Sequence, residues 1–326
     1  MTNVISMAPA ADSRGGAAAP ASGDALAWPS LSALLRHMRT SPVNLGRSLT
    51  MAVNHVRARR RWPGLTGQLR ESPLLEAVLQ RGTEAFTPLV RELADRRLSL
   101  AERFEVYALS VQTADRLLSA TAQDELRQGR RVVLLAQDGF QIDLGVNEYS
   151  MEEGLWSVTL RGAEGVRLST ASLSFLPGDR LLVGCVQGPK MSDALALGEI
   201  RRATHAFHGL RPPHLVLAVL KALARCGGQQ LLGVDLRVKA RLRRHKLRQG
   251  YHFDYRTFWG ELGGTLNGDD HWVLPLDDSE QRQLSEVPAK KRSMYRRRNE
   301  WLANLAPQLR PHLAPSLRPP VDRTAA

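Results

Sequence analysis

The chain has 326 residues, with 45 Lys and Arg against 32 Asp and Glu, which gives a formal net charge of +13. Its hydrophobic fraction of 43% is ordinary for a folded protein and excludes a fully disordered chain. The two cysteines, Cys185 and Cys226, exclude a disulfide-rich scaffold and a cysteine-rich zinc site. No segment has the roughly 18 uninterrupted apolar residues that a membrane-spanning helix needs. The basic excess indicates an anionic partner: nucleic acid, an anionic membrane surface or a phosphorylated small molecule.

Both ends of the chain have compositions that predict little order. Residues 1–29 are rich in Ala, Gly, Ser and Pro, which cannot offset the entropy lost on folding, so we expect a disordered tail. The segment lacks the apolar run of a signal peptide, so we expect a cytoplasmic protein, with peripheral association at the inner membrane as a further option. Residues 307–326 are rich in proline, which prevents a continuing helix and predicts a loosely ordered Pro-rich tail.

Between the tails, the spacing of apolar residues separates two units. Residues 30–128 have helical spacing and predict a helical lobe of four or five helices, one of which begins with the capping-box pair Ser99 and Glu102. Residues 129–306 begin with short β-type runs separated by turn signals, which predict an antiparallel meander. These runs are 131–136, 140–146, 155–160, 168–175 and 180–186.

The segment after Pro189 predicts a helical crossover. Helices are expected over residues 194–207 and 215–225, followed by a strand at 230–235. Strands joined by a helical crossover pair in parallel, so the sheet is expected to be mixed. A strand at 271–276 and a basic helix at about 279–305 follow. The predicted fold class is therefore α+β: an N-terminal helical lobe followed by a mixed, largely antiparallel sheet with a helical crossover.

Four strings in the second half carry a family resemblance. They are VQGPK at 186–190, IRRATHAFHGLRP at 200–212, YHFDYRTFWGELGG at 251–264 and EVPAKKRSMYRRR at 286–298. Together, and in this order, they resemble the VirK/YbjX-like family of bacterial proteins over roughly residues 30–306. The resemblance implies a cytoplasmic Gram-negative protein connected with virulence, surface-protein placement and survival of antimicrobial peptides, and it implies no established catalytic residue.

A weaker resemblance concerns architecture. The meander, helical crossover, parallel strand and final strand resemble the layout of GNAT acyltransferases, whose strand-to-helix junction binds the pyrophosphate of acyl-coenzyme A. The corresponding junction here is Gln187–Ser192, which departs from the glycine-rich family pattern because Gly188 is its single glycine and Pro189 lacks an amide donor. Acyl-coenzyme A is therefore a cofactor under this interpretation alone, and fold analogy does not establish function.

The junction also suggests a ligand site. Gln187, Gly188 and Lys190 follow an apolar strand and precede a helix, which favours either an anion-binding loop or a turn that needs its glycine and proline for shape. Arg211, before the next helix, is a further candidate for anion binding. His205, His208 and His214 lack the further ligands of a metal site, so no metal is expected.

The densest aromatic and polar cluster spans residues 251–261. Asp254 is expected to cap a helix, with Phe258 and Trp259 packed into the core. Under the acyltransferase interpretation, Tyr251 or Tyr255 would be the catalytic general acid.

Basic segments are the clearest physical signal. Arg237–Arg248 and Lys290–Arg298 are rich in Lys and Arg and contain no acid, and Arg57 to Arg61 form a third cluster. They predict contact with phosphates, against the alternative of a solvated helix face. The candidates in the last segment are Lys290, Lys291, Arg292, Arg296, Arg297 and Arg298.

These features lead to three functional hypotheses. The first is a cytoplasmic factor of the VirK/YbjX-like family that acts on envelope integrity through a basic, anion-binding surface. The second is a GNAT-like acyltransferase that uses acyl-coenzyme A or an acyl carrier. The third is a nucleic-acid-binding protein, which no zinc-finger or RNA-recognition signature supports. Motifs of hydrolases, P-loop NTPases, dehydrogenases and kinases are absent from the sequence.

Overall fold

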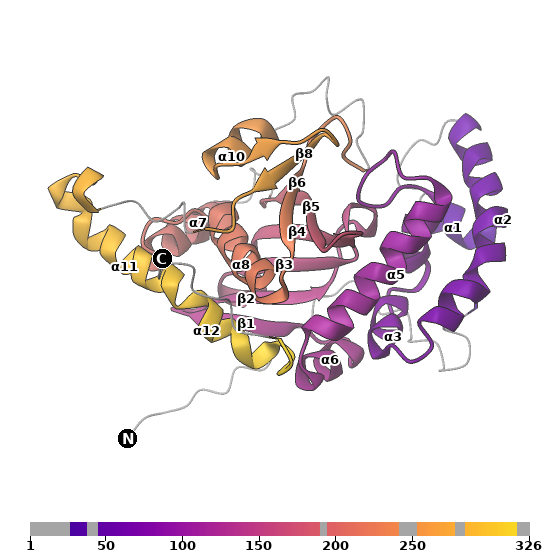
Figure 1. Ribbon diagram of the computed structural model, residues 1–326, viewed down its shortest axis with the longest axis horizontal. Coiled ribbons are helices and arrows are strands. Elements are labelled where there is room, and N and C mark those ends of the chain that lie inside the picture. The colour runs from indigo at the N-terminus through magenta and orange to yellow at the C-terminus, as the bar shows by residue number, and fades with distance from the viewer. Residues whose placement is uncertain (1–26, 38–44, 190–193, 241–252, 278–283, 318–326) are drawn as a thin grey trace.

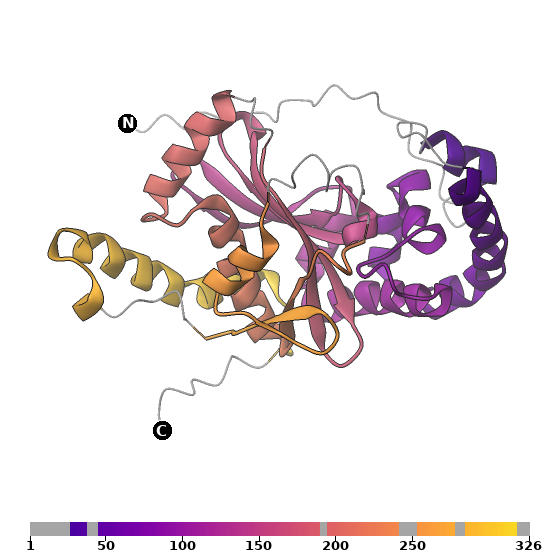
Figure 2. The same ribbon diagram turned by 90° about the horizontal axis from the view of Figure 1, so that it is seen from above.

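The computed structural model describes residues 27–37, 45–189, 194–240, 253–277 and 284–317. The predicted sites Lys190 and Tyr251, the basic residues 241–248 and the outer parts of both tails lie outside these ranges. A helical lobe forms one end of the molecule, a twisted sheet forms the middle, and helix α11 projects from the other end (Figures 1 and 2).

The N-terminal lobe is helical, as predicted. Its described part has six α-helices, one more than the upper expectation, because the single turn α4 follows a 3-10 turn instead of joining a longer helix. The capping box is confirmed: Ser99 accepts from the Glu102 amide, and the Glu102 carboxylate accepts from the Ser99 amide. The helices are α1 (Leu31–His37), α2 (Leu45–Gln68), α3 (Pro73–Leu79), α4 (Thr87–Val90), α5 (Leu100–Leu117) and α6 (Ala120–Arg127).

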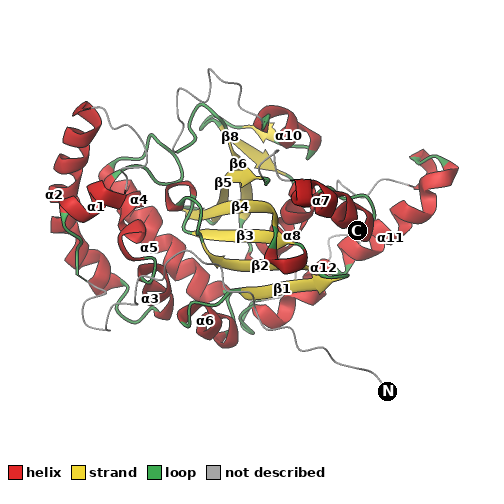
Figure 3. Ribbon diagram, turned by 180° about the vertical axis from the view of Figure 1, so that it is seen from behind, coloured by secondary structure: helices red, strands yellow, loops and turns green. Residues whose placement is uncertain are grey.

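The eight described strands form one mixed sheet in the order β1-β2-β3-β4-β5-β6-β8-β7, which Figure 3 shows from behind. The first five are the predicted antiparallel meander, and β5 pairs with β6 in parallel, as the crossover requires. The strands are β1 (Val132–Gln137), β2 (Phe140–Val146), β3 (Trp156–Arg161), β4 (Arg167–Leu176), β5 (Arg180–Gln187), β6 (Gln230–Val234), β7 (Thr265–Leu266) and β8 (His271–Leu274).

Helices cover the centre of this sheet. The crossover consists of α7 (Ala194–Ala206) and α8 (Pro212–Gly227), and α8 ends where Gly228 adopts a left-handed conformation. Helix α8 contacts β3, β4 and β6, while α5 of the lobe contacts β4. Residues 168–176 of β4 are all buried, so both faces of this central strand are covered. The sheet therefore provides the common core of the lobe and the crossover.

The C-terminal segment differs from the sequence expectation. The basic helix α11 (Arg292–Ala303) begins only after Pro288, which lacks the amide that a helix interior needs, and short 3-10 turns precede it. Helix α12 (Leu305–Leu309) contains Pro307 in its first turn, where the amide needs no partner. Leu309 and Leu313 are buried, so the chain is packed to Leu313 instead of becoming loosely ordered from Pro307.

Strands β5 and β6 separate halfway along β5. Their parallel pairing ends at Val183 and Gly233, and Gly184 is an extra, bulged residue opposite β4. Helix α10 (Tyr255–Glu261) lies over the separation, and the Trp259 indole donates a 2.9 Å hydrogen bond to the Val234 carbonyl. A Cβ on Gly233 would lie 2.5 Å from the Trp259 ring, so the indole needs a glycine beneath it.

We therefore expect Gly233→Ala to displace Trp259 and to lower the free energy of unfolding by roughly 1–3 kcal/mol, the usual effect of overpacking a core. The matched control is Gly198→Ala on α7, where an added Cβ meets no atom within 4 Å. This control should be neutral or stabilising by up to about 1 kcal/mol. Urea denaturation of both variants tests the packing, and equal stabilities would contradict it.

Candidate functional site

Polar side chains meet below the surface where β5 and β6 separate. Lys239, which follows β6, is fully buried, and its ammonium group donates to the Glu153 carboxylate and, at 2.8 Å, to the Gly184 carbonyl. Glu153 ends the short 3-10 turn before β3 and is also buried. A buried ion pair needs such additional hydrogen bonds to offset the loss of hydration. Lys239, predicted as part of a basic surface, is therefore an internal cation.

Tyr255 and Cys185 complete this junction cluster. The Tyr255 hydroxyl accepts a 3.0 Å hydrogen bond from the Val186 amide and lies 3.3 Å from the Cys185 Sγ atom. The Gln187 amide donates to Glu153 Oε2 and to Cys185 Sγ, both at 3.2 Å. Burial, and next the Glu153 charge, raise the pKa of the Cys185 thiol, so it stays protonated at neutral pH and is not an activated nucleophile.

These contacts bury Tyr255, which the acyltransferase interpretation would expose to a substrate. Tyr255 is 1% exposed and Trp259 is fully buried, as predicted for the core role of this helix. A general acid must reach its substrate, and the Tyr255 hydroxyl is not accessible among the described residues. Gln187 belongs to the cluster, whereas Gly188 is exposed and its carbonyl accepts a 3.4 Å hydrogen bond from Arg167. Within the described residues, Gln187 is therefore part of a packed cluster, and residues 190–193 of the junction lie outside them.

The predicted basic residues near the C-terminus are exposed, in contrast to the buried Lys239. We call residues 289–303 the basic arm, because a 3-10 turn and α11 form a rod that projects from the body (Figures 1 and 2). Its outer cations are exposed, and none of them has an acidic partner among the described residues. They are Lys290, Lys291, Arg292, Arg296 and Arg297.

The base of the arm is fixed to the body. Trp301 is buried, packs edge-on against Phe207 with ring centroids 5.4 Å apart, and donates a 2.9 Å hydrogen bond to the Gln137 side chain. Arg298 donates to the His208 carbonyl from Nε at 3.1 Å and from Nη2 at 3.0 Å. Its guanidinium therefore joins the arm to the turn after α7, whereas the one printed backbone bond of an outer cation, from Arg292 to the Val287 carbonyl, is local to the arm.

Arg211 belongs neither to the junction cluster nor to the basic arm. It is exposed before α8, and its side chain makes no hydrogen bond or ion pair within the described residues. No hydrogen bond or ion pair among those residues joins it to Gln187 or Gly188, and Lys190, the third residue of the predicted strand-to-helix site, lies outside the described residues.

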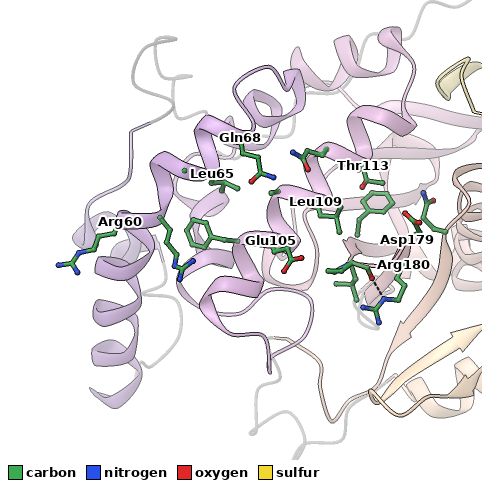
Figure 4. Close-up of a pocket in the computed structure, with 18 residues that line it drawn as sticks. Arg60, Leu65, Gln68, Glu105, Leu109, Thr113, Asp179 and Arg180 are labelled. Atoms are coloured by element: carbon green, nitrogen blue, oxygen red, sulfur yellow. Dashed lines mark hydrogen bonds between the residues drawn. The ribbon is translucent and has the colours of Figure 1, made fainter.

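A groove of about 680 Å³ lies between α2, α5 and the turn from β4 to β5 (Figure 4). Leu65 and Leu109 contribute apolar surface, while its charged lining has both signs, with Glu105 and Asp179 beside Arg180. Of the residues with a predicted role, Arg60 and Arg61 of the third basic cluster line it. The mixed charge does not favour an anion there.

A polar contact between the lobe and the sheet was not predicted. Asp95, in the loop before α5, accepts hydrogen bonds from Arg97 at 2.7 Å and interacts with His271 Nε2 at 3.1 Å, and Arg97 also donates to the Asp269 carbonyl at 2.6 Å. Burial alone would raise the pKa of Asp95, but hydrogen bonds from His271 and Arg97 outweigh it and lower the pKa to about 2. The ionised carboxylate thus helps to hold the lobe on the sheet.

The family model described as "Protein of unknown function (DUF535)" matches residues 45–311. The chain therefore belongs to the DUF535 family, which supports the predicted VirK/YbjX-like membership. No solved structure matches the chain, and the GNAT resemblance gains no support.

The relatives include proteins of three bacteria. An uncharacterized protein of Haemophilus influenzae is 30% identical over 220 residues, covering 67% of this chain and 74% of the relative. YbjX of Escherichia coli is 29% identical over 288 residues, covering 86% of this chain and 74% of the relative. Membrane protein LapB of Mannheimia haemolytica is 33% identical over 96 residues, covering 29% of this chain and 42% of the relative.

The low pKa of Asp95 gives a pH-dependent prediction. A carboxyl whose pKa falls from 3.8 to about 2 on folding stabilises the fold above about pH 4 and loses this contribution as the pH falls towards 2. Asp95→Asn should lower the free energy of unfolding by roughly 2 kcal/mol at neutral pH, and the difference from wild type should shrink in acid.

Denaturant titrations at several pH values measure this difference, with Asp124→Asn on the exposed face of α6 as the control. A deficit of Asp95→Asn that is constant with pH would contradict the role of the ionised carboxylate.

Proposed function

We propose that the protein is a cytoplasmic factor that binds a phosphate-bearing envelope component through its basic arm, with anionic lipid as the experimental probe of that component. The observation that carries the proposal is the set of exposed cations on the arm without acidic partners among the described residues. In this role it would support envelope integrity, and with it virulence and resistance to antimicrobial peptides, as the family resemblance implies.

The position of the charges argues for an anion. Lys290, Lys291 and Arg292 precede or begin α11, whose first turn has no acidic residue, so they lie at the positive end of the helix dipole. Arg292 and Arg296 are four residues apart and repel one another along one face. Each effect costs only a few tenths of a kcal/mol. A bound phosphate would reverse both, because it neutralises the cations and meets the helix N-terminus.

A bilayer is the anionic surface that we favour. Basic segments gain about 1 kcal/mol per Lys or Arg at a membrane that contains anionic lipid. One relative carries the name of a membrane protein, which supports the same class of partner. Within the described residues no helix is long and apolar enough to cross a membrane, so the proposed contact is peripheral. An acyltransferase activity is not proposed, because Tyr255, its candidate general acid within the described residues, is buried.

The test is charge reversal in the arm. Arg296→Glu together with Arg297→Glu should weaken binding to phosphatidylglycerol-containing vesicles by about 30-fold or more at low salt, because two contacts of about 1 kcal/mol each are lost. Binding of the unaltered protein by this arm should weaken as salt is raised. Vesicle co-sedimentation measures both effects.

The control is Arg116→Glu with Arg127→Glu on α5 and α6, which makes the same change in net charge at other exposed arginines. Equal loss in the control would mean that net charge alone matters, and undiminished binding of the arm variant would exclude the arm. A salt-sensitive loss of duplex DNA or RNA binding, without any change in vesicle binding, would replace the proposal with nucleic-acid binding.

A further inference from the structure

Helix α2 exposes an apolar stripe on its outer face. Leu49, Val53 and Val56 are 66%, 42% and 52% exposed, and their spacing of four and three residues places them on one side of the helix. The opposite side, with Ala58, Trp62 and other apolar residues, is buried against the lobe. Isolated exposed apolar side chains are common, but this aligned row lies opposite the core face and is not part of the core that the described residues form.

Arginines surround this stripe. Arg57, Arg59 and Arg60 are exposed, and Arg60 continues the line of the stripe one turn beyond Val56. Arg60 also lines the groove between α2, α5 and the turn from β4 to β5 (Figure 4). The whole helix has no Asp or Glu. The outer face of α2 therefore combines apolar contact area with positive charge and carries no negative charge.

This combination identifies the class of partner. A helix that lies in the surface of an anionic bilayer has an apolar row that enters the headgroup–acyl boundary, with cations that reach the phosphates. Arginine suits that position because its stem is apolar and its head can extend to the polar layer. The apolar row and the arginines that flank it therefore match the charge and the layering of an anionic lipid surface.

We propose that α2 is a membrane-contacting element, in which Leu49, Val53 and Val56 enter an anionic lipid surface while Arg57, Arg59 and Arg60 bind lipid phosphates. This inference does not rest on the basic arm. Helix α2 and α11 lie at opposite ends of the molecule (Figures 1 and 2), and the exposed face of α2 points away from the body. A protein held on a bilayer by α2 would leave the arm accessible to a second anionic partner.

The first test removes the apolar row and keeps helix propensity. Leu49→Gln, Val53→Gln and Val56→Gln together should weaken binding to phosphatidylglycerol-containing vesicles by about tenfold or more, and the loss should persist at high salt because apolar insertion is not screened. The matched control is Leu195→Gln with Leu197→Gln, which removes exposed apolar surface from α7. The arm variant, Arg296→Glu with Arg297→Glu, should instead weaken vesicle binding mainly at low salt.

A second measurement reports insertion directly. The described cysteines, Cys185 and Cys226, are buried, so a thiol-reactive fluorophore on Val53→Cys labels the outer face of α2 selectively. Lipids brominated near the headgroup should quench this fluorophore, and the same label on Leu195→Cys should not be quenched.

The inference would be overturned if the triple variant bound the vesicles as tightly as the unaltered protein, or if the label at position 53 were not quenched. Either result would leave the basic-arm proposal intact. A triple variant that binds vesicles normally but changes from oligomer to monomer would assign the stripe to a contact between protein copies instead.

Discussion

The buried ion pair between Lys239 and Glu153 is the interaction on which the arrangement of the molecule depends. The Lys239 ammonium also binds the Gly184 carbonyl, at the bulge where β5 and β6 separate. The backbone of Lys239 bridges to Asp95, so the same residue joins the sheet to the loop of the helical lobe. Removing one partner of such a pair leaves a buried, uncompensated charge, which typically costs about 3–5 kcal/mol. The lobe, the bulge and the crossover are thus held in one geometry.

The packed side chains between β5 and β6 argue against a ligand site at this junction. In open α/β sheets a ligand often binds where parallel strands separate, but here Tyr255 and Trp259 of α10 occupy that place. Two exposed features of the described residues could instead meet a partner: cations without acidic partners on the basic arm and an apolar row on α2. Both elements accept unfavourable local placement, like charges on one helix and apolar groups in water, that a partner would relieve. These two ends are therefore the binding surfaces that we propose.

The sequence predicted what depends on local spacing and failed where distant residues meet. The capping box at Ser99, the meander and the parallel strand after a helical crossover all follow from short-range patterns, and the structure confirms them. The internal position of Lys239 could not be predicted, because its partner Glu153 is 86 residues away and a basic run usually indicates a solvated face. The contact of Asp95 with His271 spans 176 residues and leaves no local signal. Of the predicted arm residues, Arg298 alone is half-buried, and it binds the distant His208 carbonyl. Its position in the sequence did not distinguish it from Arg296 and Arg297.

The central claim, that anionic surfaces are recognised at the two ends and not at the strand junction, can be tested by hydrogen–deuterium exchange of the full chain. Exchange rates would be measured in the presence of phosphatidylglycerol vesicles, of uncharged vesicles and of acyl-coenzyme A, and compared with those of the protein alone. We predict slower exchange in residues 289–303 and 45–62 with the anionic vesicles alone, and no change in residues 182–188 or 255–259 under any condition. Protection of the strand junction by acyl-coenzyme A, with unchanged exchange in the basic arm and α2, would contradict this claim.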